Sequence, residues 1–316
     1  MTGLDQQLLR LPQMKTIQEA LARGETPVLA VGLAQIHKAG VIHALTQNRG
    51  ALVITQDEPT AVRLSEDIAA FFGSEELVMQ YPSRDFTFRE LEGASLEYEH
   101  AGLKVLERLG DGRCHIVVAS AEAACQKTIP PDELRRRMTV LRPGESWPVD
   151  TLVKLLLEAG YQRCDQVEGV CQFSVRGGIV DFYPPDAADP IRMELWGDEI
   201  DTIASFKVDT QRREQNLEET VISPAREVLL GTGEEAAALL EQKKNALRGP
   251  RAAAARARLE QDIAKLRDGL SLVSADRFLE LAYEQPAILT DYAGDRLCFF
   301  CEPAGIKEGL RGALWQ

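Results

Sequence analysis

Short apolar runs alternate with amphipathic stretches through the first 120 residues of the chain. The apolar runs have the length of buried strands and lie at 28–31, 51–55, 77–81 and 115–119. Stretches with the apolar spacing of a helix separate them, at 36–47, 58–72 and 97–109, and a polar helical segment precedes them at 1–26. This order of elements predicts a parallel sheet that is covered by helices.

A pattern of period two marks the middle of the chain. Val175–Tyr183 is rich in β-branched and aromatic residues and is predicted to be one strand, which Pro184 ends. Apolar and polar residues alternate over 191–196, and 199–208 is predicted to be a third strand. Together these strands predict a small antiparallel sheet with an apolar inner face. Its other face would display charged residues, namely Arg176, Arg192 and Glu194.

The charged face of this sheet suits protein recognition better than catalysis, because no base or nucleophile accompanies the two arginines and the carboxylate. An alternative for each arginine is an ion pair within the chain. The whole chain carries 36 basic and 49 acidic residues, a net charge of -13. A domain that grips the phosphate backbone normally has a basic excess, so the charge disfavours autonomous DNA binding.

Composition also indicates the cellular compartment in which the chain is expected to work. No apolar run approaches the roughly 20 residues of a membrane span, and no basic segment followed by an apolar one opens the chain. Six cysteines in 316 residues do not indicate a disulfide framework. These features predict a cytoplasmic protein with no membrane partner.

The strand, glycine and helix at 28–38 occupy the order of a nucleotide-binding loop, G-x-x-x-x-G-K-[ST]. With Gly32 as the first glycine, the remaining positions fall on His37, Lys38 and Ala39. The lysine is present, but the second glycine and the magnesium-binding hydroxyl are missing. The loop is therefore predicted to be degenerate, retained as architecture, with no bound cofactor and no catalytic residue.

Several short motifs follow one another in a fixed order around the predicted sheet. They are Tyr161-x-Arg163, Phe173-x-x-Arg176-Gly177, Asp181-x-x-Pro184, Arg192-x-Glu194, Gly197-Asp-Glu-Ile-Asp201 and Asp209-Thr-Gln211-Arg212. This order resembles the UvrB-homology region at the N-terminus of the bacterial transcription-repair coupling factors, and the repair protein UvrB shares much of it. The resemblance implies a UvrB-like α/β fold in which the ATP site has decayed.

The resemblance also implies a domain plan. A degenerate nucleotide-binding-like domain of the P-loop type would begin at 1–125 and be completed by a return segment at 211–316. A small α+β domain at 126–210, the UvrA-binding domain, would be inserted between these two parts. At the far end of the chain, the family's magnesium-binding Asp-Glu is replaced by Cys301-Glu302. Cys298-x-x-Cys301 permits a zinc site only with two further ligands, for which Cys164 and Cys171 are candidates by count, so core packing is the simpler interpretation.

The resemblance implies a non-catalytic module that recruits UvrA, the damage-recognition ATPase of nucleotide excision repair, to stalled transcription complexes. The positions that match polar residues of UvrB's UvrA-binding face are Arg163, Arg176, Arg192 and Glu194, with Phe182 as an apolar contact. UvrB has one more arginine where this chain has Ser174. The full-length family protein is an ATP-dependent DNA translocase that also binds RNA polymerase and DNA, and those regions are not expected here.

Two other functions compete with UvrA binding. A nucleotide-dependent, helicase-like fragment is disfavoured by the degenerate loop. A DNA-binding fragment is disfavoured by the net acidity and by the short run at 82–97, where UvrB places a tyrosine-rich hairpin that clamps DNA.

Overall fold

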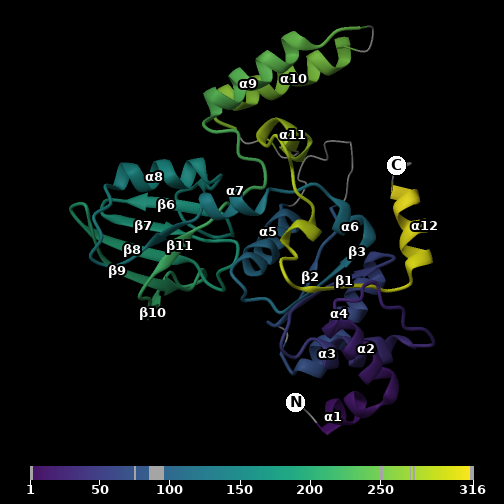
Figure 1. Cartoon of the computed structure of the whole chain (residues 1–316). Helices are drawn as coiled ribbons and strands as arrows, with labels where there is room; N and C mark the ends of the chain where they lie inside the picture. The colour runs from purple at the N-terminus through teal and green to yellow at the C-terminus, as the bar shows by residue number, and fades with distance from the viewer. Residues whose placement is uncertain are drawn as a thin grey trace. The chain divides into compact units, whose positions relative to one another are not determined.

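The computed structural model describes residues 3–74, 76–84, 96–249, 252–270, 272 and 275–313. The chain forms two compact units (Figure 1). The first comprises Met1–Asp85, Val105–Gln126 and Ile288–Gln316, and the second comprises Phe86–Lys104 and Lys127–Ala287. These units reflect contacts within the chain, and the expected domain boundaries at residues 125 and 210 stay a prediction.

The first unit contains the predicted parallel sheet, with strand order β12-β1-β3-β2. Its strands are β1 (Ala51–Thr55), β2 (Val78–Tyr81), β3 (Ile116–Ser120) and β12 (Leu297–Phe300), and every neighbouring pair is parallel. Every residue of the two central strands, β1 and β3, is buried. Near-continuous apolar runs of this kind are typical of parallel strands that are covered on both faces. The prediction of a mixed α/β fold with a parallel sheet is confirmed.

The helices predicted at 36–47, 58–72 and 97–109 are present as α3 (Gln35–Leu45), α4 (Glu58–Phe72) and α5 (Glu97–Gly110), and α5 contributes its last turns to the first unit. The other described α-helices of this unit are α1 (Gly3–Arg10), α2 (Pro12–Ala22), α6 (Ala121–Cys125) and α12 (Pro303–Ala313). Helix α4 shows how local sequence sets the ends. The Asp57 carboxylate accepts a hydrogen bond from the Thr60 amide at 2.9 Å, and Gly73 ends the helix at φ +67°.

The strand predicted at 28–31 is wrong, because the segment has no strand assignment and pairs with no strand of the described chain. Leu29 and Val31 are 78% and 81% exposed. Two features of the segment explain this outcome. Pro27 has no amide hydrogen to donate to a ladder, and Gly32 turns the chain at φ +79° immediately afterwards. Strand β1 meanwhile has a partner on each side, β12 and β3.

The exposure of this segment predicts that polar substitution there is tolerated. Leu29→Ser and Val31→Ser should each change the free energy of unfolding by less than about 0.5 kcal/mol, as is usual for surface sites. Val53→Ser on buried β1 is the control, and it should cost more than about 2 kcal/mol. Urea denaturation of the three variants measures the difference. If Leu29→Ser lowers the free energy of unfolding as much as Val53→Ser does, the prediction of a buried strand at 28–31 was correct.

The second unit is built on a six-stranded sheet of order β10-β9-β8-β7-β6-β5. The strands are β5 (Gln162–Arg163), β6 (Gln172–Arg176), β7 (Ile179–Phe182), β8 (Ile191–Trp196), β9 (Glu199–Phe206) and β10 (Arg213–Asn216). The pairs are antiparallel, except that β5 runs parallel to β6. The antiparallel sheet predicted from the alternation is therefore larger than expected.

The single strand predicted over Val175–Tyr183 is wrong, because a tight hairpin turn divides it into β6 and β7. Gly177 has φ +60°, which a residue with a side chain adopts only at a cost in strain. The Gly177-Gly178 pair is itself a hairpin signal, which the β-branched residues on either side obscured.

Helix α8 (Val149–Glu158) packs its leucine face on one face of this sheet. The core there is formed by buried apolar side chains, including Leu152, Leu156, Phe173, Val180, Phe182, Met193 and Ile203. Burial of each large side chain contributes about 1.5–3 kcal/mol. The second unit also contains α7 (Pro131–Arg136), the pair of β4 (Thr139–Leu141) with β11 (Thr220–Ile222), and short helices at Ala275–Phe278 and Leu279–Ala282.

Helices α9 (Gly233–Ala246) and α10 (Ala252–Arg267) form a hairpin in which they lie side by side (Figure 1). A reciprocal capping box between Thr232 and Glu235 begins α9. The buried Asp262 on α10 is paired by Arg277, whose guanidinium donates to both carboxylate oxygens at 2.7 Å. Arg256 on α10 donates a hydrogen bond within the hairpin, to the carbonyl of Leu247 at 2.6 Å.

Candidate protein-binding face

Strand alternation divides the side chains of β6–β9 between two faces. The inner face carries the apolar core that packs against α8. The opposite face, here called the outer face, is formed by two cross-strand rows. The first row is Ser174, Asp181, Arg192 and Ala204, and the second is Arg176, Ile179, Glu194 and Thr202. Arg176, Arg192 and Glu194 therefore share the outer face, and their role in binding stays a prediction.

Asp181 lies in the first row, and its carboxylate is buried between two guanidinium groups. Arg192 binds it with two hydrogen bonds, from Nε to Oδ1 at 2.7 Å and from Nη2 to Oδ2 at 2.8 Å. Arg176 adds a third, from Nη2 to Oδ2 at 2.7 Å. The side chain of Asp181 is 1% exposed, whereas that of Arg176 is 48% exposed. One buried carboxylate therefore orients both arginines of the outer face.

Arg192 is held on several sides and is 15% exposed. Its Nη1 donates to the carbonyl of Gln211 at 3.1 Å, and its guanidinium lies 4.5 Å from the centroid of the Phe206 ring. The hydrogen bond to Asp181 raises the pKa of Arg192 above its ordinary value. These contacts give Arg192 a fixed position, so it contributes chiefly to the shape of the face.

Arg163 and Arg176 have more freedom to meet a partner. Arg163, on the short strand β5, is exposed, and its guanidinium has no ion pair or side-chain hydrogen bond within the described chain. Arg176 stands at the end of β6 with about half of its side chain exposed. Glu194 is 40% exposed and accepts from Arg213 and from Thr202, each at 3.3 Å. Both contacts to Glu194 are long for hydrogen bonds to a carboxylate.

Phe182 does not lie on this face, so the surface contact expected of it is wrong. Its side chain is fully buried, and its ring packs edge-on against Tyr161 with centroids 6.1 Å apart. The reason is strand alternation, because Phe182 pairs with Phe173 and Ile191 in a row of the inner face. The hairpin turn at Gly177 sets that register.

Two residues that shape the face were missed by the sequence analysis. Asp181 was taken as one position of a motif, although a carboxylate in the middle of an apolar strand indicates a buried partner. Gln211 holds a left-handed conformation at φ +57°, and its side-chain amide donates to the carbonyls of Val208 at 2.9 Å and Val167 at 3.3 Å. This arrangement presents the Gln211 carbonyl to Arg192.

The degenerate loop predicted around Gly32 begins helix α3 in the first unit. Lys38 forms an ion pair with Glu302, at 2.5 Å between Nζ and Oε1, and this contact lowers the pKa of the Glu302 carboxyl. Ala39 is fully buried in the core, while His37 is exposed. Lys38 therefore has an acidic partner in the chain, and Ala39, at the position where the loop motif would have its hydroxyl, is a packed methyl group.

The cysteines do not assemble a metal centre within the described chain, where no group of three or more His, Cys, Asp or Glu side chains could hold an ion. Cys298 is exposed and Cys301 half-buried beside β12, and Cys171 is buried in the second unit. Burial raises the pKa of the Cys171 and Cys301 thiols, which keeps them protonated.

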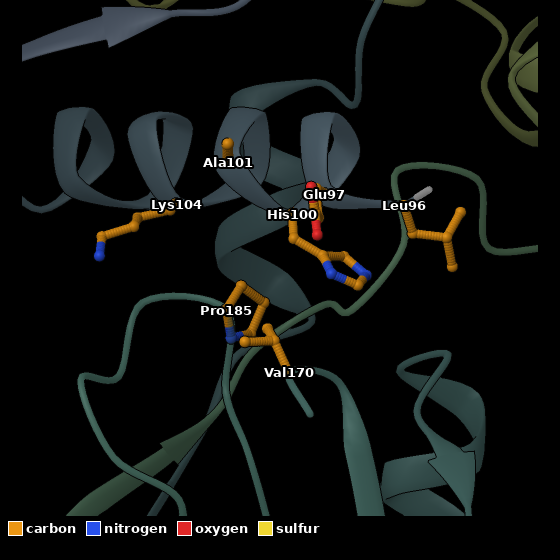
Figure 2. Close-up of a pocket in the computed structure, with 7 residues that line it drawn as sticks. All are labelled: Leu96, Glu97, His100, Ala101, Lys104, Val170 and Pro185. Atoms are coloured by element: carbon orange, nitrogen blue, oxygen red, sulfur yellow. The ribbon is translucent and has the colours of Figure 1, made fainter. Parts of the chain in front are cut away.

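A pocket of about 420 Å³ lies in the second unit (Figure 2). Its lining is formed by Leu96, Glu97, His100, Ala101, Lys104, Val170 and Pro185. Nε2 of His100 is buried without a hydrogen-bond partner in the described structure, and burial lowers the pKa of this imidazole. None of the described residues that line the pocket is a Ser, Thr or Cys that this imidazole could activate. The connecting loop predicted at 82–97 falls mostly on residues 85–95, outside the described residues.

The family model described as "UvrB interaction domain" matches residues 139–228, the segment that forms the outer face. The chain is also 31% identical over 291 residues to the transcription-repair-coupling factor of Bacillus subtilis (strain 168), covering 89% of this chain and 25% of that protein. For the Staphylococcus aureus (strain MRSA252) factor the identity is 28% over 279 residues, covering 85% and 24%.

These similarities confirm the resemblance of the chain to the N-terminal UvrB-homology module of the transcription-repair coupling factors. The chain spans about a quarter of the length of the curated relatives it matches. Among the helices in the described ranges, none is long and apolar enough to cross a membrane.

The geometry around Asp181 predicts that substitutions of Asp181 and of Arg176 differ greatly in their effect on the free energy of unfolding. Asp181→Asn should lower the free energy of unfolding by about 3 kcal/mol, because it leaves Arg192 charged and nearly buried without its counter-ion. Arg176→Ala should cost less than about 1 kcal/mol, since its side chain is half exposed. Urea denaturation of both variants measures this. Equal effects of the two substitutions would contradict the assignment of Asp181 as the buried anchor.

Proposed function

We propose that this chain is a non-catalytic protein-binding module that recruits UvrA in transcription-coupled nucleotide excision repair. The observation that carries the proposal is a pair of exposed arginines, Arg163 and Arg176, on the sheet of a UvrB interaction domain. The name of the similar proteins, transcription-repair-coupling factor, supports the repair pathway. In a longer protein, other regions would bind RNA polymerase and DNA.

The chemistry of the proposed contact is recognition of carboxylates. A guanidinium binds a carboxylate through two parallel hydrogen bonds, and Arg176 uses one of its nitrogens for Asp181. Its remaining nitrogen donors are available to an acidic group on UvrA. Arg163 has no competing partner within the described chain, so its whole guanidinium can take part. Arg192 and Glu194 would set the shape and register of the contact.

The proposal that the module lacks catalysis depends on the region around α3. Lys38 is neutralised by Glu302, and Ala39 offers no oxygen to a magnesium ion. Both features disfavour the alternative of a nucleotide-dependent, helicase-like fragment. The net charge of -13 disfavours the second alternative, a DNA-binding fragment, because a phosphate backbone would be repelled.

Titration with magnesium-ATP tests the absence of a working nucleotide site. Isothermal calorimetry should detect no binding tighter than about 1 mM, which corresponds to about -4 kcal/mol. Lys38→Ala is the control, because heat from non-specific association should be the same in this variant. A micromolar dissociation constant that Lys38→Ala abolishes would overturn the proposal of a degenerate site.

Charge reversal tests the proposed contact with UvrA. Arg163→Glu should weaken UvrA binding at least 30-fold, because truncation of a desolvated charge pair costs about 2–5 kcal/mol and each 1.4 kcal/mol is tenfold. Its thermal midpoint should stay unchanged, since Arg163 has no partner in the described chain. Arg176→Glu should weaken binding similarly but also cost some stability, because the new carboxylate would lie near Asp181.

Arg135→Glu is the matched control for both reversals. Arg135 is 69% exposed on α7 and pairs with Asp132 one turn away. Its reversal should leave UvrA affinity within about twofold of the parent chain. Biolayer interferometry with immobilised UvrA gives the three affinities. If Arg163→Glu and Arg176→Glu both bind UvrA as Arg135→Glu does, the arginines of this sheet are not the contact.

A further inference from the structure

Trp196 ends strand β8 with its side chain in solvent. It is 86% exposed, more than any other large apolar residue whose exposure the structure describes. A scattered apolar residue on a surface needs no explanation. An indole ring beside the charged outer face is different, because tryptophan and arginine are the residue types that dominate binding energy in protein interfaces.

Alternation along β8 places the indole on the outer face. Leu195 packs against the inner core, so its neighbours Glu194 and Trp196 point to the other side of the sheet. Glu194 belongs to the same cross-strand row as Ile179 and Arg176. Trp196 therefore stands one row beyond the row of Arg176, Ile179 and Glu194, in which Ile179 is half-buried.

The neighbouring hairpin turn leaves the ring uncovered. The Leu195 amide donates to the carbonyl of Gly178 at 2.7 Å, which fixes the Gly177-Gly178 turn beside this end of β8. A Cβ atom at Gly178 would approach the Leu195 carbonyl oxygen to 2.7 Å, so the close approach requires glycine. Since neither residue of the turn has a side chain, nothing in the turn covers the indole.

An irregularity in the ladder also shapes this end of the sheet. Glu194 pairs with Thr202, but Leu195 pairs with Ile200, so Asp201 is an extra residue in β9. Such a bulge increases the local twist and redirects side chains, and bulges recur next to functional sites. On the outer face, Asp181 and Ala204 are buried, whereas Arg176 and Trp196, toward the other end of the strands, are exposed to solvent.

We propose that Trp196 is the apolar anchor of the outer face and inserts into an apolar depression on the partner protein whose carboxylates meet Arg176. This inference deepens the proposed function and depends on it, so the partner is UvrA. Trp196 lies in the row next to that of Arg176 on the same face, which supports one partner protein that contacts both residues. The geometry thus gives Trp196 the apolar contact that the sequence assigned to the buried Phe182.

The physical roles of the two groups in this contact differ. Arg176 recognises charge, so its contribution falls as salt screens the interaction. Trp196 would contribute by removing apolar surface from water and filling a pocket, which salt does not screen. The ratio of affinities between a tryptophan variant and the parent should therefore be the same at low and at high salt, whereas the corresponding ratio for Arg163→Glu should shrink.

The test compares Trp196→Ala and Trp196→Phe with the parent chain in binding to purified UvrA. Trp196→Ala should weaken binding at least tenfold, and Trp196→Phe should recover most of that loss because an aromatic ring remains. Leu157→Ala is the matched control, since Leu157 is an exposed apolar residue on α8 and should not affect binding. Thermal midpoints of all variants should match the parent, because both positions are exposed.

Fluorine NMR gives a second readout that does not depend on a variant's affinity. In a chain labelled with fluorotryptophan, the resonance that Trp196→Phe removes should shift or broaden when UvrA is added. Equal affinities of Trp196→Ala and the parent would overturn the inference while leaving the proposed function intact. A parent chain that fails to bind UvrA overturns both. A parent dimer that Trp196→Ala converts to a monomer, with unchanged UvrA affinity, assigns the ring to self-association and also overturns it.

Discussion

The outer face of the second unit depends on one buried carboxylate. Asp181 accepts three hydrogen bonds from two guanidiniums, and a carboxylate with 1% exposure is stable in its charged form only with such partners. Arg192 binds Asp181 through two nitrogens and has a fixed position in the sheet. Arg176 binds it through one nitrogen, and its other nitrogens can donate to solvent or to a partner. The positions of both arginines, and so the pattern that a partner would meet, follow from Asp181.

Much of the fold was predictable, because helical spacing and buried apolar runs are local signals. The boundaries of α4, β1 and β3 lie within a residue of those predicted. The two errors in the strands arose where glycine overrode side-chain propensity. Gly32 and Gly177 both hold positive φ angles, the first directly after the run predicted as a strand at 28–31 and the second within the single strand predicted over Val175–Tyr183. Propensity scales weigh residue types, whereas these positions are decided by backbone conformation.

The candidate site was less predictable than the fold, because it depends on which face each side chain takes. A one-residue difference in register moves a side chain from core to solvent, and the unrecognised turn at Gly177 hid that register. Phe182 was expected at the surface from the resemblance alone, although it is in the core, and Trp196 was passed over, although it is exposed. Arg163 and Arg176 were singled out because they match motifs of the resembled family, and their role in binding stays a prediction. Asp181 required knowledge of which residue lies across the ladder from it.

The packing of Ala39 limits how this chain could change in future. A serine there would bring back the hydroxyl of a phosphate-binding loop, but the site is fully buried, and an unpaired hydroxyl in the core costs about 1–3 kcal/mol. Lys38 would also have to release Glu302 before it could reach a phosphate. A serine at position 39 alone would therefore lower stability without giving the chain a phosphate-binding loop.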